Sequence, residues 1–114
     1  MHIQQVFKSV IWTDLKLDFL KSLDKASNKY IREAKKTKEA KQYIKKFGDF
    51  GRSFHSGTLL NDTDFWDLKR YINQKALEYL NHQGYDMSFY DLFFSELWVQ
   101  EFAKKGGGHH SAHI

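Results

Sequence analysis

The sequence predicts a single α+β domain built from a leading strand, two helices and then further strands. Three observations predict it: a β-forming run at 3–12, two helix-forming segments at 14–46 and 61–83, and an aromatic segment at 92–104 that alternates with a period of two. The 114 residues are enough for one domain with a modest core. Aromatic residues make up 17% of the chain, which favours a packed interior over disorder.

The first two predicted elements are a strand and a long helix. Residues 3–12 are rich in β-branched and aromatic side chains, and Asp14 ends the run. Residues 14–46 are rich in Lys, Ala and Glu and contain neither Pro nor Gly, so one helix is expected there. Its apolar stripe thins after Ala34, which predicts a solvated helix or a mobile extension in its second half.

A glycine-containing loop and a second helix follow. Residues 47–51 carry two glycines and are expected to form the loop, and residues 52–56 a short strand. Asn61 is the expected N-cap of the second helix, and Asp62, Asp64 and Asp67 suit the positive end of its dipole. Gly84 stands where a left-handed C-terminal cap is expected.

The segment 92–104 is the clearest strand prediction. Both of its alternating faces are largely apolar, which is typical of a strand covered on two sides. A turn at 105–108 would then lead into a further, antiparallel strand from His109 onward. One predicted face carries Phe94, Glu96, Trp98, Gln100 and Phe102, and the other carries Phe93, Ser95, Leu97, Val99 and Glu101.

Composition excludes several classes of site. The chain has no cysteine, so disulfides, thiolate metal sites and cysteine nucleophiles are absent. The sequence contains no phosphate loop, dinucleotide fingerprint or serine-nucleophile elbow. No signal peptide and no apolar run of about 20 residues is present, so a cytoplasmic protein without a membrane partner is expected.

The positive charge is concentrated in one segment. Residues 25–46 hold nine Lys or Arg against two Glu, whereas the whole chain has a formal charge of +4. Such a segment could bind nucleic acid or an acidic membrane surface. Its aromatic residues, Tyr30 and Tyr43, are too sparse for a stacking platform, so a solvated helix face is the favoured interpretation. A small basic nucleic-acid-binding module remains an alternative function.

Three of the six histidines, His109, His110 and His113, lie in the last six residues. Without cysteine, any metal must be bound by histidine, carboxylate or amide groups, and a closed site needs three or four of them. On a strand, His109 and His113 would share one face. The segment could also be a polar turn with unliganded histidines or a remnant of a purification tag. A non-enzymatic divalent-metal binder is therefore a third hypothesis.

Two other polar groups have open interpretations. Glu96 and Gln100 stand between aromatic residues, and burying them costs several kcal/mol unless they find partners. Their face either lines a pocket that holds a polar ligand or belongs to an edge strand that leaves them in solvent. His55, close to two serines, is expected to be a hydrogen-bonded structural residue.

The stretch 96–114, ELWVQEFAKKGGGHHSAHI, resembles the 2-oxoglutarate and Fe(II)-dependent oxygenases, in particular a group found in phage and marine bacterial genomes. The stretches 47–51, FGDFG, and 53–62, SFHSGTLLND, are similar to that group as well. The resemblance implies a double-stranded β-helix of the jelly-roll or cupin-like kind. Residues 1–114 would form its N-terminal part, with the C-terminal strands missing.

The resemblance also implies cofactors and site residues. The cofactors would be Fe(II) and 2-oxoglutarate, used for hydroxylase-type oxidation of a C–H bond in an unknown substrate. His113 would be the first iron ligand, and Trp98, Gln100 and Phe102 would help to wall the cofactor pocket, unless the strand register slips by one residue. The other iron ligands and the basic residue for 2-oxoglutarate would follow Ile114, so this chain alone is not expected to be active.

Overall fold

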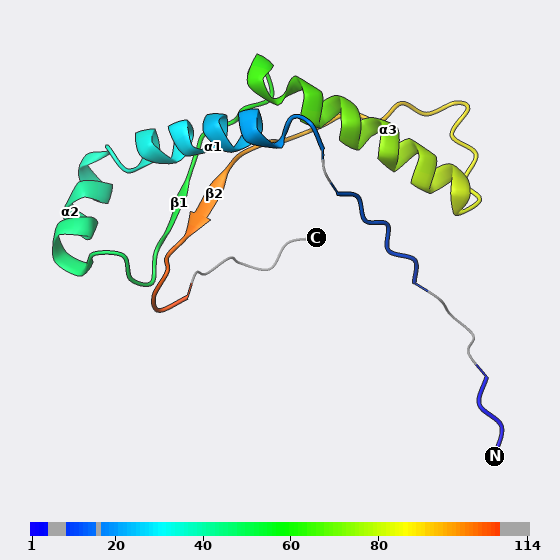
Figure 1. The fold of residues 1–114 in the computed structure, drawn as a ribbon, viewed down its shortest axis with the longest axis horizontal. Helices are drawn as coiled ribbons and strands as arrows, with labels where there is room; N and C mark the ends of the chain where they lie inside the picture. The colour runs from blue at the N-terminus through cyan, green and yellow to red at the C-terminus, as the bar shows by residue number, and fades with distance from the viewer. Residues whose placement is uncertain (5–8, 16, 108–114) are drawn as a thin grey trace.

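A computed structural model describes residues 1–4, 9–15 and 17–107. The chain combines helices with one antiparallel pair of strands, which confirms the α+β class (Figure 1). The described residues form no jelly roll, so the double-stranded β-helix stays a prediction. The elements are, in order, α1 (Leu20–Ala34), α2 (Lys38–Phe47), β1 (Ser53–His55), the 3₁₀ helix η1 (Thr63–Phe65), α3 (Trp66–His82) and β2 (Gln100–Phe102).

The prediction of one helix over 14–46 is wrong, because two helices occupy this segment and the first begins only at Leu20. The break lies at Thr37, whose backbone is extended (φ −61°, ψ 154°) and whose hydroxyl accepts a hydrogen bond from the Ala40 amide. A threonine that caps a new helix in this way competes with continuation of the old one. The helix α2 then ends at Gly48, where φ is +63°.

The second predicted helix is confirmed with a small shift at its start. Asp62, rather than Asn61, is the capping residue, and its carboxylate accepts a hydrogen bond from the Asp64 amide at 2.8 Å. One 3₁₀ turn precedes α3, and tight first turns of this kind are common at helix starts. At the other end Gly84 has a φ of +91°, as expected for a left-handed C-terminal cap.

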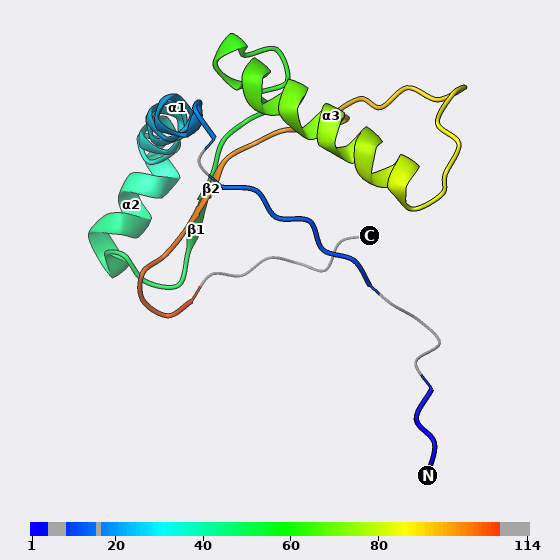
Figure 2. The same cartoon turned by 45° about the vertical axis from the view of Figure 1, so that its right-hand side comes forward.

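The predicted N-terminal strand is wrong for the described residues 3, 4 and 9–12, which belong to no sheet. Residues 9–15 instead approach α3 as an extended arm (Figures 1 and 2). The Trp12 ring meets the rings of Tyr79 and His82 edge-on, with centroids 5.2 and 5.5 Å away. The Tyr79 hydroxyl donates to the Val10 carbonyl at 2.8 Å. A residue with β preference, Trp12, thus contacts a helix while it stays partly exposed, because propensity yields to available packing partners.

The strand predicted at 52–56 is confirmed as β1, and only three residues of the strand predicted at 92–104 form β2. The two strands pair with Ser53 opposite Phe102 and His55 opposite Gln100. Beyond the strand ends the pairing continues irregularly. The amides of Ser56 and Leu59 donate to the carbonyls of Val99 and Leu97 at 2.9 and 2.8 Å, and the Val99 amide donates to the Ser56 hydroxyl at 3.0 Å.

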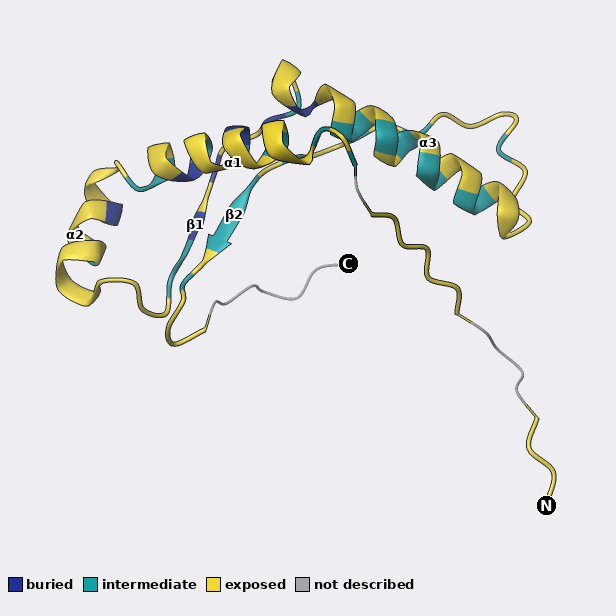
Figure 3. Cartoon of the chain, viewed as in Figure 1, coloured by how far each residue is buried: buried dark blue, intermediate teal, exposed yellow. Residues whose placement is uncertain are grey.

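The core is small and lies where α1, β1 and η1 meet (Figure 3). The accessible surface is 10044 Å², whereas a compact protein of this mass exposes about 6,600 Å². The radius of gyration is 19.0 Å, against about 13 Å for a compact domain of this length. The chain is therefore an open arrangement around a local core. That core consists of Ala26, Leu59 and Phe65, with Leu23, Tyr30, Leu68, Leu97 and Val99 packed against it.

Candidate functional site

The β1–β2 sheet has one face toward α1 and one face away from it. On the α1 side, Phe54 is buried, and Glu101 forms an ion pair with Lys35. Residues directly opposite each other in an antiparallel pair share a face. Ser53, His55, Gln100 and Phe102 therefore lie on the other side, which we call the open face together with Trp98.

The alternation predicted from the sequence is confirmed between residues 97 and 102. Leu97 and Val99 pack against the core, whereas Trp98 and Phe102 keep much of their surface exposed. No register slip has occurred, so the three residues predicted to wall a cofactor pocket occupy one face. Their cofactor-binding role stays a prediction.

His55 also lies on the open face, and it is hydrogen-bonded, as the sequence predicts. Its ring stacks on Trp98 with a centroid distance of 5.2 Å and an interplanar angle of 24°. Its Nδ1 contacts the Ser56 carbonyl, which can only accept, so the hydrogen bond assigns the proton to Nδ1. The lone pair then lies on Nε2. Ser53 and His55 are alternate residues of a short strand, so their side chains share one face.

Glu96 and Gln100, for which the sequence left two interpretations open, differ in burial. Glu96 is exposed, in agreement with the interpretation that placed it in solvent. Gln100 is half-buried, and its amide nitrogen donates to the Ser53 hydroxyl across the strands at 3.1 Å. The open face therefore carries one fixed amide, one oriented imidazole and two large aromatic rings.

The metal prediction rests on residues whose placement is not described. His109, His110 and His113 all lie outside the described residues. Within residues 1–4, 9–15 and 17–107, no three His, Asp or Glu side chains come together as a metal site. Since a facial iron site needs three ligands, the described residues alone do not fit Fe(II). The assignment of His113 as a ligand stays a prediction.

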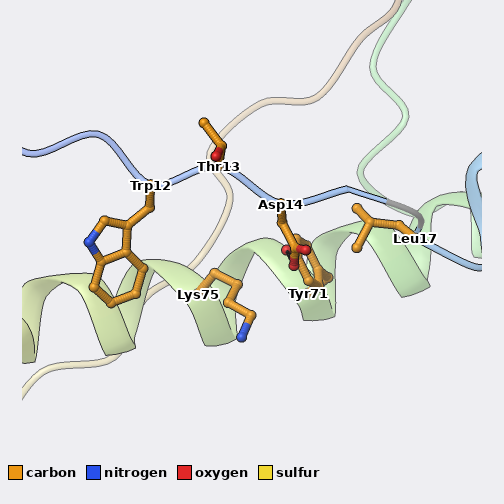
Figure 4. Close-up of a pocket in the computed structure, with 6 residues that line it drawn as sticks. All are labelled: Trp12, Thr13, Asp14, Leu17, Tyr71 and Lys75. Atoms are coloured by element: carbon orange, nitrogen blue, oxygen red, sulfur yellow. Dashed lines mark hydrogen bonds between the residues drawn. The ribbon is translucent and has the colours of Figure 1, made fainter.

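A second candidate region is the hollow between the N-terminal arm and α3, about 330 Å³ in volume (Figure 4). Asp14 accepts hydrogen bonds from the Tyr71 hydroxyl and from the Leu15 amide, the latter at 2.8 Å. The Lys75 ammonium lies 5.9 Å from the centre of the Tyr71 ring. Of these contacts, the hydrogen bond between Tyr71 and Asp14 joins the arm to the helix. The hollow is lined by Trp12, Thr13, Asp14, Leu17, Tyr71 and Lys75.

The Asp14–Tyr71 pair shifts both pKa values. Hydrogen bonding to Tyr71, then to the Leu15 amide, lowers the pKa of Asp14 below 3.8. Donation to Asp14, followed by desolvation, raises the pKa of Tyr71 from 10.0 to about 12. A lowered acid pKa adds stability above the unfolded value that is lost as the pH falls through the folded value. A raised tyrosine pKa adds stability below pH 10 that is lost as the pH rises through the folded value.

We therefore expect arm docking to be pH-dependent at both extremes. In an ultraviolet titration of tyrosinate, the phenol of Tyr71 should ionise near pH 12. The substitution Asp14→Asn should return that phenol toward its ordinary value of 10.0, because the charged acceptor is lost. Asp18→Asn, at an exposed position nearby, is the matched control and should leave the titration unchanged. If the pKa of Tyr71 were the same with and without Asp14→Asn, the hydrogen bond between the arm and α3 would be contradicted.

No described helix is both long and apolar enough to cross a membrane. Comparisons of this chain with protein-family models, with curated proteins and with solved structures give no match.

Proposed function

We propose that this chain is the N-terminal part of a 2-oxoglutarate and Fe(II)-dependent oxygenase domain, and that its open face walls the cofactor pocket. The observation that carries the proposal is the pairing of two family-like stretches. The strand β1 lies within residues 53–62, and β2 lies within residues 96–114. Although more than forty residues separate them in the chain, they are hydrogen-bonded neighbours in one sheet. A shared family origin accounts for both stretches together.

The orientation of the two-stranded sheet further supports the proposal. The helix α1 covers one face, and the chain leaves β2 toward the glycine turn and the histidine-rich end. A sheet that is supported by helices on one side and lined by aromatic and polar residues on the other suits a ligand site. Trp98, Gln100 and Phe102 stand on that second side.

The residues of the open face have distinct roles in this proposal. The rings of Trp98 and Phe102 exclude water from one wall, and the Gln100 amide, held by Ser53, orients a polar ligand. His55 offers the Nε2 lone pair as a hydrogen-bond acceptor. When bound, Fe(II) and 2-oxoglutarate would supply the oxidising chemistry for a substrate C–H bond.

The test is turnover by the polypeptide that the complete reading frame encodes. We expect the DNA after the Ile114 codon to encode a histidine or carboxylate within one or two residues, then further strands and a late histidine. With Fe(II), that polypeptide should convert 2-oxoglutarate to succinate, and His113→Ala should abolish the conversion because three ligands are needed. His82→Ala, on α3, is the matched control and should retain turnover. A stop codon directly after Ile114, or turnover that survives His113→Ala, would contradict the proposal.

A further inference from the structure

Five exposed positive charges lie along the outer side of α1 and in the turn after it, and we call them the basic stripe: Lys21, Lys25, Lys29, Arg32 and Lys36. Helical residues turn by about 100° each, so the first four, which lie within α1, fall within an arc of about 80°, and Lys36 follows in the turn between α1 and α2. The residues of α1 that pack on the core occupy the opposite side, among them Leu23, Ala26 and Tyr30. All five cations are exposed.

The charges of the stripe are not neutralised within the described part of the chain. There, none of the five forms an ion pair, since the two ion pairs are Lys35–Glu101 and Lys75–Glu78. The acidic residues of α1, Asp24 and Glu33, fall outside the arc. Like charges one turn apart destabilise a helix by about 0.2–0.5 kcal/mol per pair. A binding partner with negative charge would remove this repulsion.

Three cations of the stripe also border one hollow on the protein surface. Its volume is about 330 Å³. Asp64 contributes the one negative charge of its lining, so the three cations leave it net positive. The hollow gives the stripe a concave section that would partly enclose an anionic group, and enclosure strengthens electrostatic attraction. Its lining residues are Ser22, Lys25, Ala26, Lys29, Arg32 and Asp64.

We propose that the basic stripe binds the phosphate backbone of a nucleic acid. From Lys21 to Arg32 the four helical cations of the stripe rise about 16 Å along the helix axis, and Lys36 lies beyond them. A duplex strand carries one phosphate per about 3.4 Å of axis, so about five phosphates lie along those 16 Å. The five cations of the stripe are therefore about as many as the phosphates that they would face. Recognition of this kind is independent of base sequence.

An acidic membrane surface fits the stripe less well. A helix that binds a membrane interface inserts its apolar face among the lipids in addition to placing charges at the headgroups. The apolar face of α1 is occupied by its packing against Leu59 and Phe65. The basic residues of α2 do not extend the line, because α2 turns away from α1 in both views (Figures 1 and 2). This inference does not depend on the oxygenase proposal.

Fluorescence anisotropy of a labelled, mixed-sequence DNA duplex of about 20 base pairs tests the stripe across salt concentrations. Five phosphate contacts predict a slope of log K against log salt of about −4.5, or a loss of about 500-fold between about 50 and 200 mM salt. The double variant Lys25→Gln/Lys29→Gln should bring the slope to about −2.7. Glutamine has a helix propensity like that of lysine, so circular dichroism should show α1 retained.

A charge-matched control separates the stripe from net charge. Arg70→Gln/Lys104→Gln removes two exposed positive charges elsewhere and should leave the slope unchanged. If the slope became shallower by the same amount in both double variants, the proposal would be overturned, because binding would then follow net charge alone. Absence of duplex binding at low salt would overturn it too. So would binding to phosphatidylserine-containing vesicles in preference to the duplex, which would identify a membrane surface as the partner.

Discussion

Phe65→Ala is expected to abolish cooperative unfolding of this chain. Phe65 is 1% exposed and lies at the centre of the core, with its ring centroid 6.1 Å from that of Tyr30. Removing a buried phenylalanine side chain costs about 3–5 kcal/mol. Small domains are stable by about 5–15 kcal/mol, and a chain with so small a core belongs at the low end of that range. The substitution should therefore remove most of the free energy of unfolding.

Urea denaturation followed by far-ultraviolet circular dichroism measures this effect. The matched control is Phe89→Ala, because Phe89 is 91% exposed and the same atoms are removed from water-facing surface. We expect Phe89→Ala to change the free energy of unfolding by less than about 0.5 kcal/mol. Equal effects of the two substitutions would mean that η1 and α1 do not share a core around Phe65.

The second large loss of stability is expected at Phe54, on the face of the β1–β2 sheet that α1 covers. Phe54 is 7% exposed, and the cationic groups of Lys35 and Arg52 lie 5.2 and 5.6 Å from its ring centre. Phe54→Ala should lower the free energy of unfolding by about 3–4 kcal/mol, from lost burial and lost cation–π attraction. The same urea denaturation measures it.

Phe102→Ala provides the comparison on the open face. Phe102 belongs to the neighbouring strand and is 47% exposed. Its loss should cost only about 1 kcal/mol, because about half of its side chain stays in contact with water in the folded chain. If Phe102→Ala destabilised the chain as much as Phe54→Ala, the open face would be part of the packed interior. Its role as a cofactor wall would then be untenable.

Sequence patterns were sufficient where one local rule decided the structure. The alternation at 97–102 correctly separates Leu97 and Val99 from Trp98, because each position has only one of two sides to occupy. The C-terminal cap at Gly84 is likewise local, since a positive φ favours glycine.

Sequence patterns gave the wrong structure where tertiary contacts or a competing local signal determined the conformation. The residues at 9–12 have strand propensity, yet α3 offers Trp12 aromatic packing partners, and within the described part of the chain these residues pair with no strand. Thr37 splits a segment whose composition reads as one helix, because a capping hydroxyl outweighs average propensity. His55 gains its place beside Trp98 from a pairing that spans more than forty residues, which no local pattern contains.

We propose that the open face lines an iron and 2-oxoglutarate site, and the indole signals of the three tryptophans test this role most directly. Mn²⁺ can replace Fe²⁺ as a paramagnetic probe that broadens nearby NMR signals. With Mn²⁺ and 2-oxoglutarate added to the polypeptide of the complete reading frame, the indole N–H signal of Trp98 should broaden. Those of Trp12 and Trp66, which lie on the arm and on α3, should not. A Trp98 signal that stays sharp while the others broaden, or three sharp signals, would contradict the account.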